Sequence, residues 1–219
     1  MRRRDVGGLA GVLCAVSIAA SAAVTAQDPT PVEGVWVRHE RNFVYMGVTS
    51  HYSCDGLEGK LKYLLRLAGA REDLSVRSFC SEPHGGPSRM ASARLAYYTL
   101  VPADSPQASA VPDGKSSGQA AKPLKVEPPT PGVGQWKTVE LSGSRNRELQ
   151  PGDCEVVEQF DRELLADFAT RNHTSRFSCI PHQESLNGIQ SHFEVLAPLP
   201  KAPVSKTAPV APVPPPRAG

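Results

Sequence analysis

The four cysteines that follow residue 26 have the clearest chemistry in this chain. They form two similarly spaced pairs, Cys54 with Cys80 and Cys154 with Cys179, 26 and 25 residues apart. An even number of cysteines in an exported chain predicts disulfides, because an oxidising compartment lets them persist. None lies in the C-x-x-C pair of a thiol oxidoreductase, and their spacing matches no zinc module. Structural disulfides are therefore favoured, with redox chemistry and metal binding as the alternatives.

Similar residues recur at an offset of one hundred positions. Trp36 precedes Cys54 by 18 residues, and Trp136 precedes Cys154 by 18. We interpret the chain as one supersecondary unit present twice, which favours a disulfide within each unit among the three possible connectivities. The other recurring pairs are Glu40 and Glu140, Glu58 and Glu158, Leu64-Leu65 and Leu164-Leu165, and Arg71 and Arg171.

Three histidines are candidate binding residues. His84 and His182 each follow a proline just after the second cysteine of a pair, and His51 could pair with either. A histidine in such a loop could ligate a metal or act as a general base, or it could be an exposed loop residue inherited by duplication. A periplasmic metal-binding protein that uses histidine with Met46 or Met90 is one functional alternative, although no metal or cofactor is predicted.

The two tryptophans have two possible roles. Trp36 and Trp136 could be core residues of the two units, or an aromatic platform for a peptide or a glycan. The hydroxyl, acid and histidine residues could assemble a catalytic triad, but the sequence contains no Gly-x-Ser-x-Gly elbow. No catalytic residue is predicted.

The N-terminal segment 1–26 reads as a secretory signal peptide. Three arginines precede a small-residue apolar stretch, and Val24 and Ala26 occupy the small-residue positions of a cleavage site. Cleavage would remove one cysteine and would leave 21 basic and 21 acidic residues of the original 24 and 22. The mature chain is expected in the periplasm or outside the cell, not spanning a membrane and not binding nucleic acid.

Low-complexity segments divide the rest of the chain. Residues 102–134 form a Pro/Gly/Ser-rich linker, and residues 198–219 form a Pro/Ala-rich tail; such segments cannot bury enough apolar surface to order themselves. The two units are then 34–101 and 135–197. Units of this size gain stability by sharing one core.

Each unit reads as β-α-β-β, so the predicted fold is α+β with about six strands and two main helices. The predicted strands of the first unit are 43–52, 74–80 and 93–101, and those of the second are 136–141, 175–179 and 189–196. Ser53 and Asp153 are the predicted helix N-caps, and Gly69 ends the first helix. The helix faces are Leu57, Leu61, Leu64, Leu65 and Ala68, then Val157, Phe160, Leu164, Leu165 and Phe168.

The order of these elements also constrains the disulfides. A helix returns the chain, so strands one and two of a unit run in the same direction. Cys54 begins the helix after strand one, and Cys80 ends strand two. Both cysteines are therefore expected at one rim of the sheet, which independently favours pairing within the unit.

Two stretches resemble a group of exported proteobacterial proteins with no assigned activity. The first runs from Phe43 through Tyr52-Ser53-Cys54-Asp55-Gly56-Leu57 to Arg71, and the second from Asp153 through Cys179 to His182. The resemblance implies export and a bacterial envelope setting, and carries over no catalytic residue. The leading hypothesis is a non-enzymatic binding or interaction module with an envelope protein or glycan as its partner. A periplasmic hydrolase acting on envelope polymers is the competing hypothesis.

Overall fold

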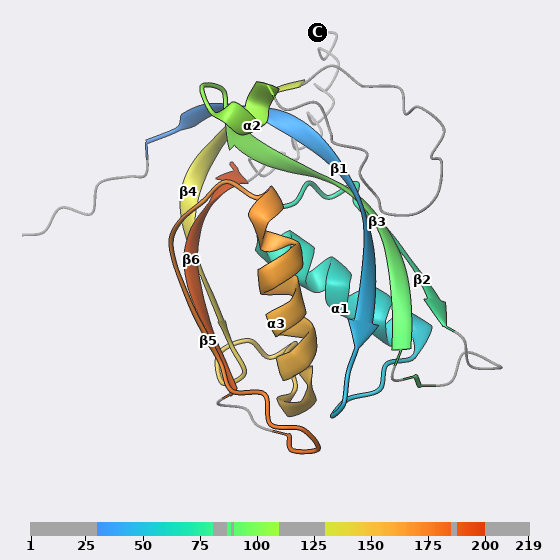
Figure 1. The fold of residues 1–219 in the computed structure, drawn as a ribbon. Helices are drawn as coiled ribbons and strands as arrows, with labels where there is room; N and C mark the ends of the chain where they lie inside the picture. Colours follow the sequence, from blue (N-terminus) through green and yellow to red (C-terminus); the bar gives the residue numbers. More distant parts are fainter. Residues whose placement is uncertain (1–29, 81–86, 89, 110–129, 185–187, 200–219) are drawn as a thin grey trace, which may run out of the picture.

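The computed structural model describes residues 30–80, 87–88, 90–109, 130–184 and 188–199 (Figure 1). Among these residues it contains six strands and two helices of more than two turns, so the predicted α+β class is confirmed. The strands are β1 (Val32–Met46), β2 (Ser75–Cys80), β3 (Met90–Pro102), β4 (Thr130–Ser142), β5 (Thr170–Phe177) and β6 (Ile189–Pro198). The helices are α1 (Cys54–Leu67), α2 (Pro106–Ser109) and α3 (Cys154–Glu163), with 3₁₀ turns η2 (Pro151–Asp153) and η3 (Leu165–Asp167).

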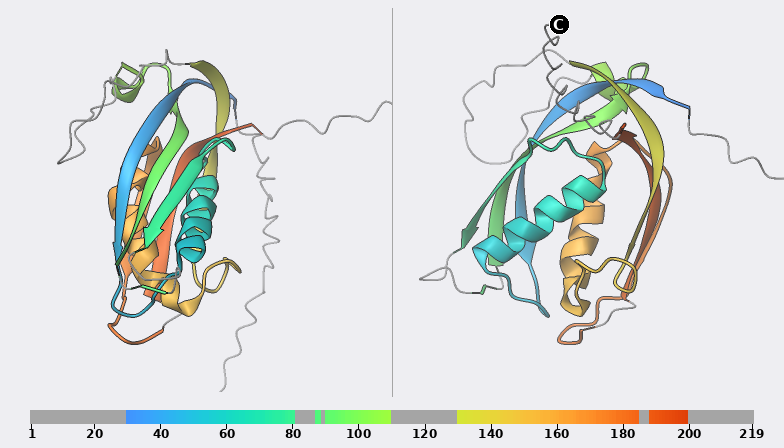
Figure 2. Two further views of the ribbon diagram at one scale, coloured as in Figure 1. Left: turned by 90° about the vertical axis from the view of Figure 1, so that its right-hand side faces the viewer. Right: turned by 180° about the vertical axis from the view of Figure 1, so that it is seen from behind.

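All six strands belong to one antiparallel sheet in the order β2-β3-β1-β4-β6-β5. Strands β1 and β4 pair only over Val32–Trp36 and Thr130–Gly134. From this contact the two halves of the sheet diverge like the sides of an arch, with α1 and α3 between them (Figures 1 and 2). The sheet therefore has an inner face that covers the helices and an outer face that is convex.

Alternation along the strands builds a single core on the inner face. Phe43 and Tyr45 of β1 and Tyr97 of β3 point inward and are fully buried, since successive strand residues face opposite sides. The core includes residues of both halves, so the two halves stabilise each other. The predicted burial of Leu64, Leu65, Leu164 and Leu165 is confirmed.

The ends of α1 follow the sequence signals. The hydroxyl of Ser53 accepts a hydrogen bond from the amide of Gly56 at 3.1 Å, as an N-cap residue does. Gly69 adopts a φ of +91°, which ends the helix in the left-handed conformation that glycine adopts without strain. A Cβ there would also lie 3.3 Å from that of Ala197 on β6.

Strand β1 begins earlier in the chain than predicted: it runs over Val32–Met46 rather than 43–52. The polar stretch Arg38–Asn42 belongs to the strand because it pairs with β3 without a break. The prediction missed this stretch because it lacks the apolar residues typical of a strand. The chain leaves the sheet at Gly47, where a Cβ would lie 1.8 Å from the hydroxyl of Tyr45. Only glycine therefore fits beside that buried tyrosine at the end of the strand.

The second half departs further from its predicted elements. Helix α3 ends at Glu163 instead of continuing to Phe168, because the tighter turn η3 places Asp167 against β1 and β3. Strand β5 then begins at Thr170, five residues before its predicted start. Asp153 is the N-cap residue of α3, but its carboxylate makes no bond to that helix and contacts other segments.

The predicted linker overlaps ordered elements at both ends. Strand β3 extends to Pro102, α2 occupies Pro106–Ser109, and β4 begins at Thr130, where pairing with β1 recruits the chain into the sheet. The predicted signal peptide 1–26, residues 110–129, most of the predicted tail and His84 lie outside the described residues. Among the described helices, none is long and apolar enough to cross a membrane.

Candidate functional site

The two predicted disulfides are present in the structure. Cys54 bonds to Cys80 with their Cα atoms 5.8 Å apart, and Cys154 bonds to Cys179 with theirs 5.5 Å apart. Both Cα separations lie within the usual range for a disulfide. Strand β2 runs in the direction of β1 with β3 between them, which brings Cys80 to the start of α1 as the strand order required. Two disulfides fit an oxidising compartment outside the cytoplasm.

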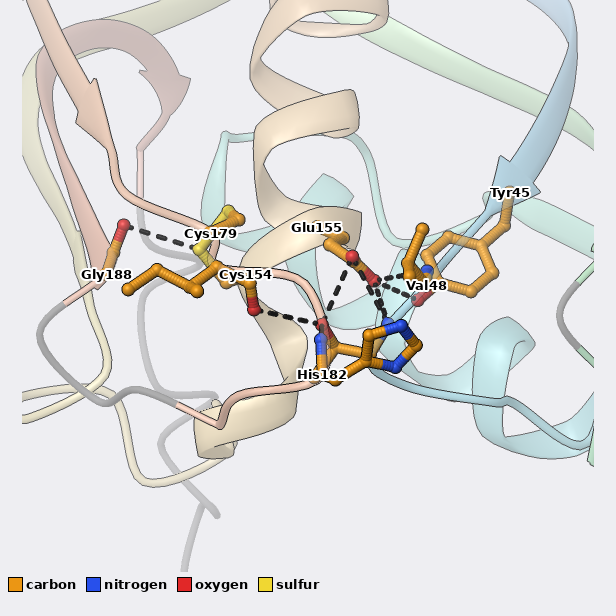
Figure 3. Close-up of a disulfide and its surroundings, with 9 residues drawn as sticks. Tyr45, Val48, Cys154, Glu155, Cys179, His182 and Gly188 are labelled. Carbon is orange, nitrogen blue, oxygen red and sulfur yellow. Dashed lines mark hydrogen bonds between the residues drawn. A yellow bond between two sulfur atoms is a disulfide. The ribbon is translucent and has the colours of Figure 1, made fainter.

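Beside the second disulfide, Glu155 joins α3 to the loop that follows β1 (Figure 3). Its carboxylate accepts hydrogen bonds from the backbone amides of Val48 and Thr49, both at 3.0 Å, and from the hydroxyl of Tyr45 at 3.3 Å. A carboxylate in the first turn of a helix also interacts favourably with the helix dipole. These contacts hold the two halves of the protein together at the end opposite the β1–β4 contact.

The predicted histidine sites are brought together only in part. The backbone amide of His182 donates to the hydroxyl of Thr49 at 3.1 Å, so His182 lies beside the loop that contains His51. His182 has a φ of +63°, and both histidines are exposed. Because His84 lies outside the described residues, its predicted pairing with His51 stays a prediction.

A buried polar network that the sequence analysis missed surrounds Asp167. Arg41 donates two hydrogen bonds to this carboxylate, one of them at 2.8 Å, and the hydroxyl of Tyr97 donates a third at 2.5 Å. Burial raises the pKa of Asp167, but these hydrogen bonds and the nearby positive charges outweigh it, so the pKa lies below its usual value. Burial raises the pKa of Tyr97 well above its usual value.

His39 extends this network toward Thr99. Its Nε2 lies 2.8 Å from the hydroxyl of Thr99, and its Nδ1 lies 3.7 Å from Asp167. The order hydroxyl, imidazole and carboxylate resembles a nucleophile triad. However, Thr99 is fully buried and its hydroxyl also donates to the Asp167 carbonyl, so no substrate can reach it. Burial lowers the pKa of His39, which favours the neutral imidazole.

A second buried carboxylate, Asp153, ties η2 to the first half. It accepts hydrogen bonds from the Tyr52 hydroxyl and, at 2.6 Å, from the Gln150 amide, and it forms an ion pair with Lys60 at 2.6 Å. Burial raises the pKa of the Tyr52 hydroxyl, so Tyr52 acts as a hydrogen-bond donor. Like the Asp167 network, this cluster is engaged in joining segments distant in sequence.

The two tryptophans lie on the outer face, each half-buried beneath an arginine. The Arg71 guanidinium carbon lies 5.5 Å from the Trp36 ring centre and 3.7 Å from that of Tyr98. The Arg171 guanidinium lies 4.3 Å from the Trp136 ring centre. Both tryptophans also pack against a small second core near the β1–β4 contact. They combine core packing with a stacked cation, and a ligand using either ring face would have to displace that cation.

No group of three or more His, Cys, Asp or Glu side chains within the described ranges is arranged to hold a metal ion. Met46 and Met90 face each other across β1 and β3, and both are exposed. A depression of about 420 Å³ lies elsewhere, on the β4-β6-β5 half. Most of the residues that line it are polar by type, among them Glu140, His192, Thr174, Arg176 and Gln190.

Exposed apolar side chains gather at the end of the molecule opposite the β1–β4 contact. In the described part of the chain, six of the eight exposed large apolar residues lie on β1, β2, β3 or the neighbouring loops at this end. We call these six residues the distal patch. They are Val44, Met46, Val48, Phe79, Met90 and Ile180.

Sequence reasoning missed the distal patch and the Asp167 network for different reasons. His39 and Arg41 occupy inward positions of β1, on the same face as Phe43 and Tyr45. Two polar residues that continue an otherwise apolar face were an available signal in the sequence. The distal patch left no comparable signal, because its residues come from separate segments. In comparisons with known proteins, no protein-family model, curated protein or solved structure matches this chain.

Proposed function

We propose that this chain is an exported protein of the bacterial cell envelope that acts by binding a partner, with the distal patch as its contact surface. The observation that carries the proposal is the clustering of the exposed apolar side chains. Monomeric proteins rarely leave apolar side chains grouped on their surface, and such groups mark sites of interaction. Phe79 is 56% exposed, Met46 63% and Met90 60%. More than half of each of these large apolar residues is therefore in contact with water.

The carboxylates that join the two halves favour binding over catalysis. The carboxylates of Asp153, Asp167 and Glu155 are each occupied by several donors that join one half of the protein to the other. A general acid or base must reach a substrate proton, and these groups are engaged in holding the fold together. The signal segment 1–26 and the two disulfides support an exported, periplasmic setting.

We further propose that the fold arose by duplication of one β-α-β-β unit. In the pairing of β1 with β4, Glu33 lies opposite Val133, so the local two-fold axis relates positions one hundred residues apart. The stacked pairs Arg71–Trp36 and Arg171–Trp136 repeat at this offset. The order of elements in the second half, β4-α3-β5-β6, also matches that of the first.

Capture of envelope partners tests the binding function. The bait is the exported protein, and the test variant replaces Met46 and Met90 by serine, two exposed positions that pair directly across the strands. Val133→Ser is the matched control, because Val133 is 47% exposed but lies at the β1–β4 contact. We expect a component that the wild type and the control retain and that the test variant loses. Equal retention by all three proteins would contradict the proposal.

A further inference from the structure

Two arginines lie directly behind the distal patch on the outer face. Arg77 of β2 and Arg94 of β3 are opposite each other in the strand register. Both are exposed, and among the described residues neither has an ion pair or hydrogen-bond partner. Like charges directly opposite one another destabilise a sheet, and within the described ranges no counter-charge offsets this cost.

The strand register places apolar and cationic residues in successive rows. Met46 and Met90 form the outermost row, and Phe79 and Val44 flank Ser92 in the next. Arg77 and Arg94 form the third row. Each row is separated from the next by two residues, or about 6.8 Å along the strand. The apolar side chains therefore protrude at the end of the molecule, and the positive charges lie behind them.

We infer that the partner of the distal patch is the surface of an anionic phospholipid bilayer, an inference that rests on the proposed binding function. A bilayer has the same order of layers, with apolar chains inside and anionic phosphates behind them. Surface-bound proteins bury apolar side chains about 5–10 Å into the boundary between headgroups and acyl chains. The guanidinium groups of Arg77 and Arg94 then reach the phosphate layer, where arginine binds in a bidentate manner.

The shape and charge of the surface favour a bilayer over other occupants. The outer face is convex (Figures 1 and 2), and the apolar side chains come from several separate segments at one end. Such a surface can enter a soft lipid layer but encloses no extended peptide. A second copy of the chain docked face to face would bring four arginines together, two from each copy, and their like charges repel.

Vesicle flotation tests this inference with the intact exported protein. The probes are vesicles of phosphatidylcholine alone and of phosphatidylcholine mixed with phosphatidylglycerol. The test variants are Met46→Ser with Met90→Ser, and Arg77→Gln with Arg94→Gln. The controls are Val133→Ser, an exposed apolar residue elsewhere, and Arg162→Gln, an arginine with a 61% exposed side chain on α3. Thermal unfolding monitored by circular dichroism checks that every variant is folded.

We expect the wild type and both controls to float with the anionic vesicles and not with the neutral ones. Each double variant should lower the partition coefficient by about tenfold or more, and added salt should weaken binding of the wild type. Absence of flotation, equal binding to neutral vesicles, or unchanged binding of the double variants would overturn the inference. If envelope extracts still yield a protein or glycan that requires the distal patch, only the lipid assignment fails; if nothing requires the patch, the proposed binding function fails with it.

Discussion

Replacement of Asp167 by asparagine is expected to destabilise the protein severely. Asp167 is 7% exposed and accepts hydrogen bonds from Arg41 and Tyr97. Asparagine has nearly the same shape, but it lacks the negative charge and presents an amide N–H group toward groups that are themselves donors. The variant therefore tests the electrostatic role of the carboxylate with little change in packing.

The expected loss follows from the burial of each partner. Tyr97 is fully buried, and a buried hydroxyl without an acceptor costs about 1–3 kcal/mol. The side chain of Arg41 is 45% exposed, so water replaces part of its lost interaction and the ion pair contributes only about 1 kcal/mol. We therefore expect Asp167→Asn to lower the free energy of unfolding by about 2–4 kcal/mol. Glu140→Gln, which breaks the exposed pair with Arg145, should cost less than about 0.5 kcal/mol.

Urea denaturation followed by tryptophan fluorescence measures these differences, since Trp36 and Trp136 report on the two halves. The pKa of Asp167 lies below its usual value in the folded protein, so its contribution is present above the unfolded pKa and is lost as the pH falls through the folded pKa. The gap between wild type and Asp167→Asn should therefore narrow below about pH 4. A loss under 1 kcal/mol, or a gap independent of pH, would refute this account of the network.

Three further perturbations address the disulfides, the end of α1 and the buried histidine. Replacing both Cys54 and Cys80 by alanine should lower the free energy of unfolding by about 2–5 kcal/mol in urea denaturation, and an unchanged midpoint would contradict this. Gly69→Ala should cost at least about 1 kcal/mol, because alanine is strained at a φ of +91° and its Cβ would crowd Ala197; a melting temperature equal to the wild type would count against it. His39 has a lowered pKa, so the unfolded chain binds the proton more readily and stability should fall as the pH drops below about 6.5. His39→Gln should reduce that slope between pH 7 and pH 5, and an identical slope in both proteins would exclude His39 as its source.

Local features of this protein were predictable from its sequence. The N-cap Ser53, the positive-φ Gly69 and the apolar stripe of α1 depend on residues within a few positions of each other, where helix geometry fixes the spacing. The disulfide pairing was also predictable, because the even cysteine count, the recurrence of the unit and the order of helix and strands all favour pairing within each unit. The start of β1 was not predictable, because pairing along β3 stabilises its polar segment.

The tertiary structure decided which of these residues meet across the two halves. Arg41 and Asp167 are 126 positions apart, and Tyr45 and Glu155 are 110 apart; only the β1–β4 contact and the helices between the sheet halves bring them together. The distal patch depends likewise on the register of three strands, since Met46 and Met90 become neighbours only when β1 and β3 pair. The sequence by itself therefore determined the kinds and order of the main elements and their covalent links, whose causes are local or follow from chain order. The polar networks and the exposed surface required the fold, because burial and pairing depend on which distant segments come into contact.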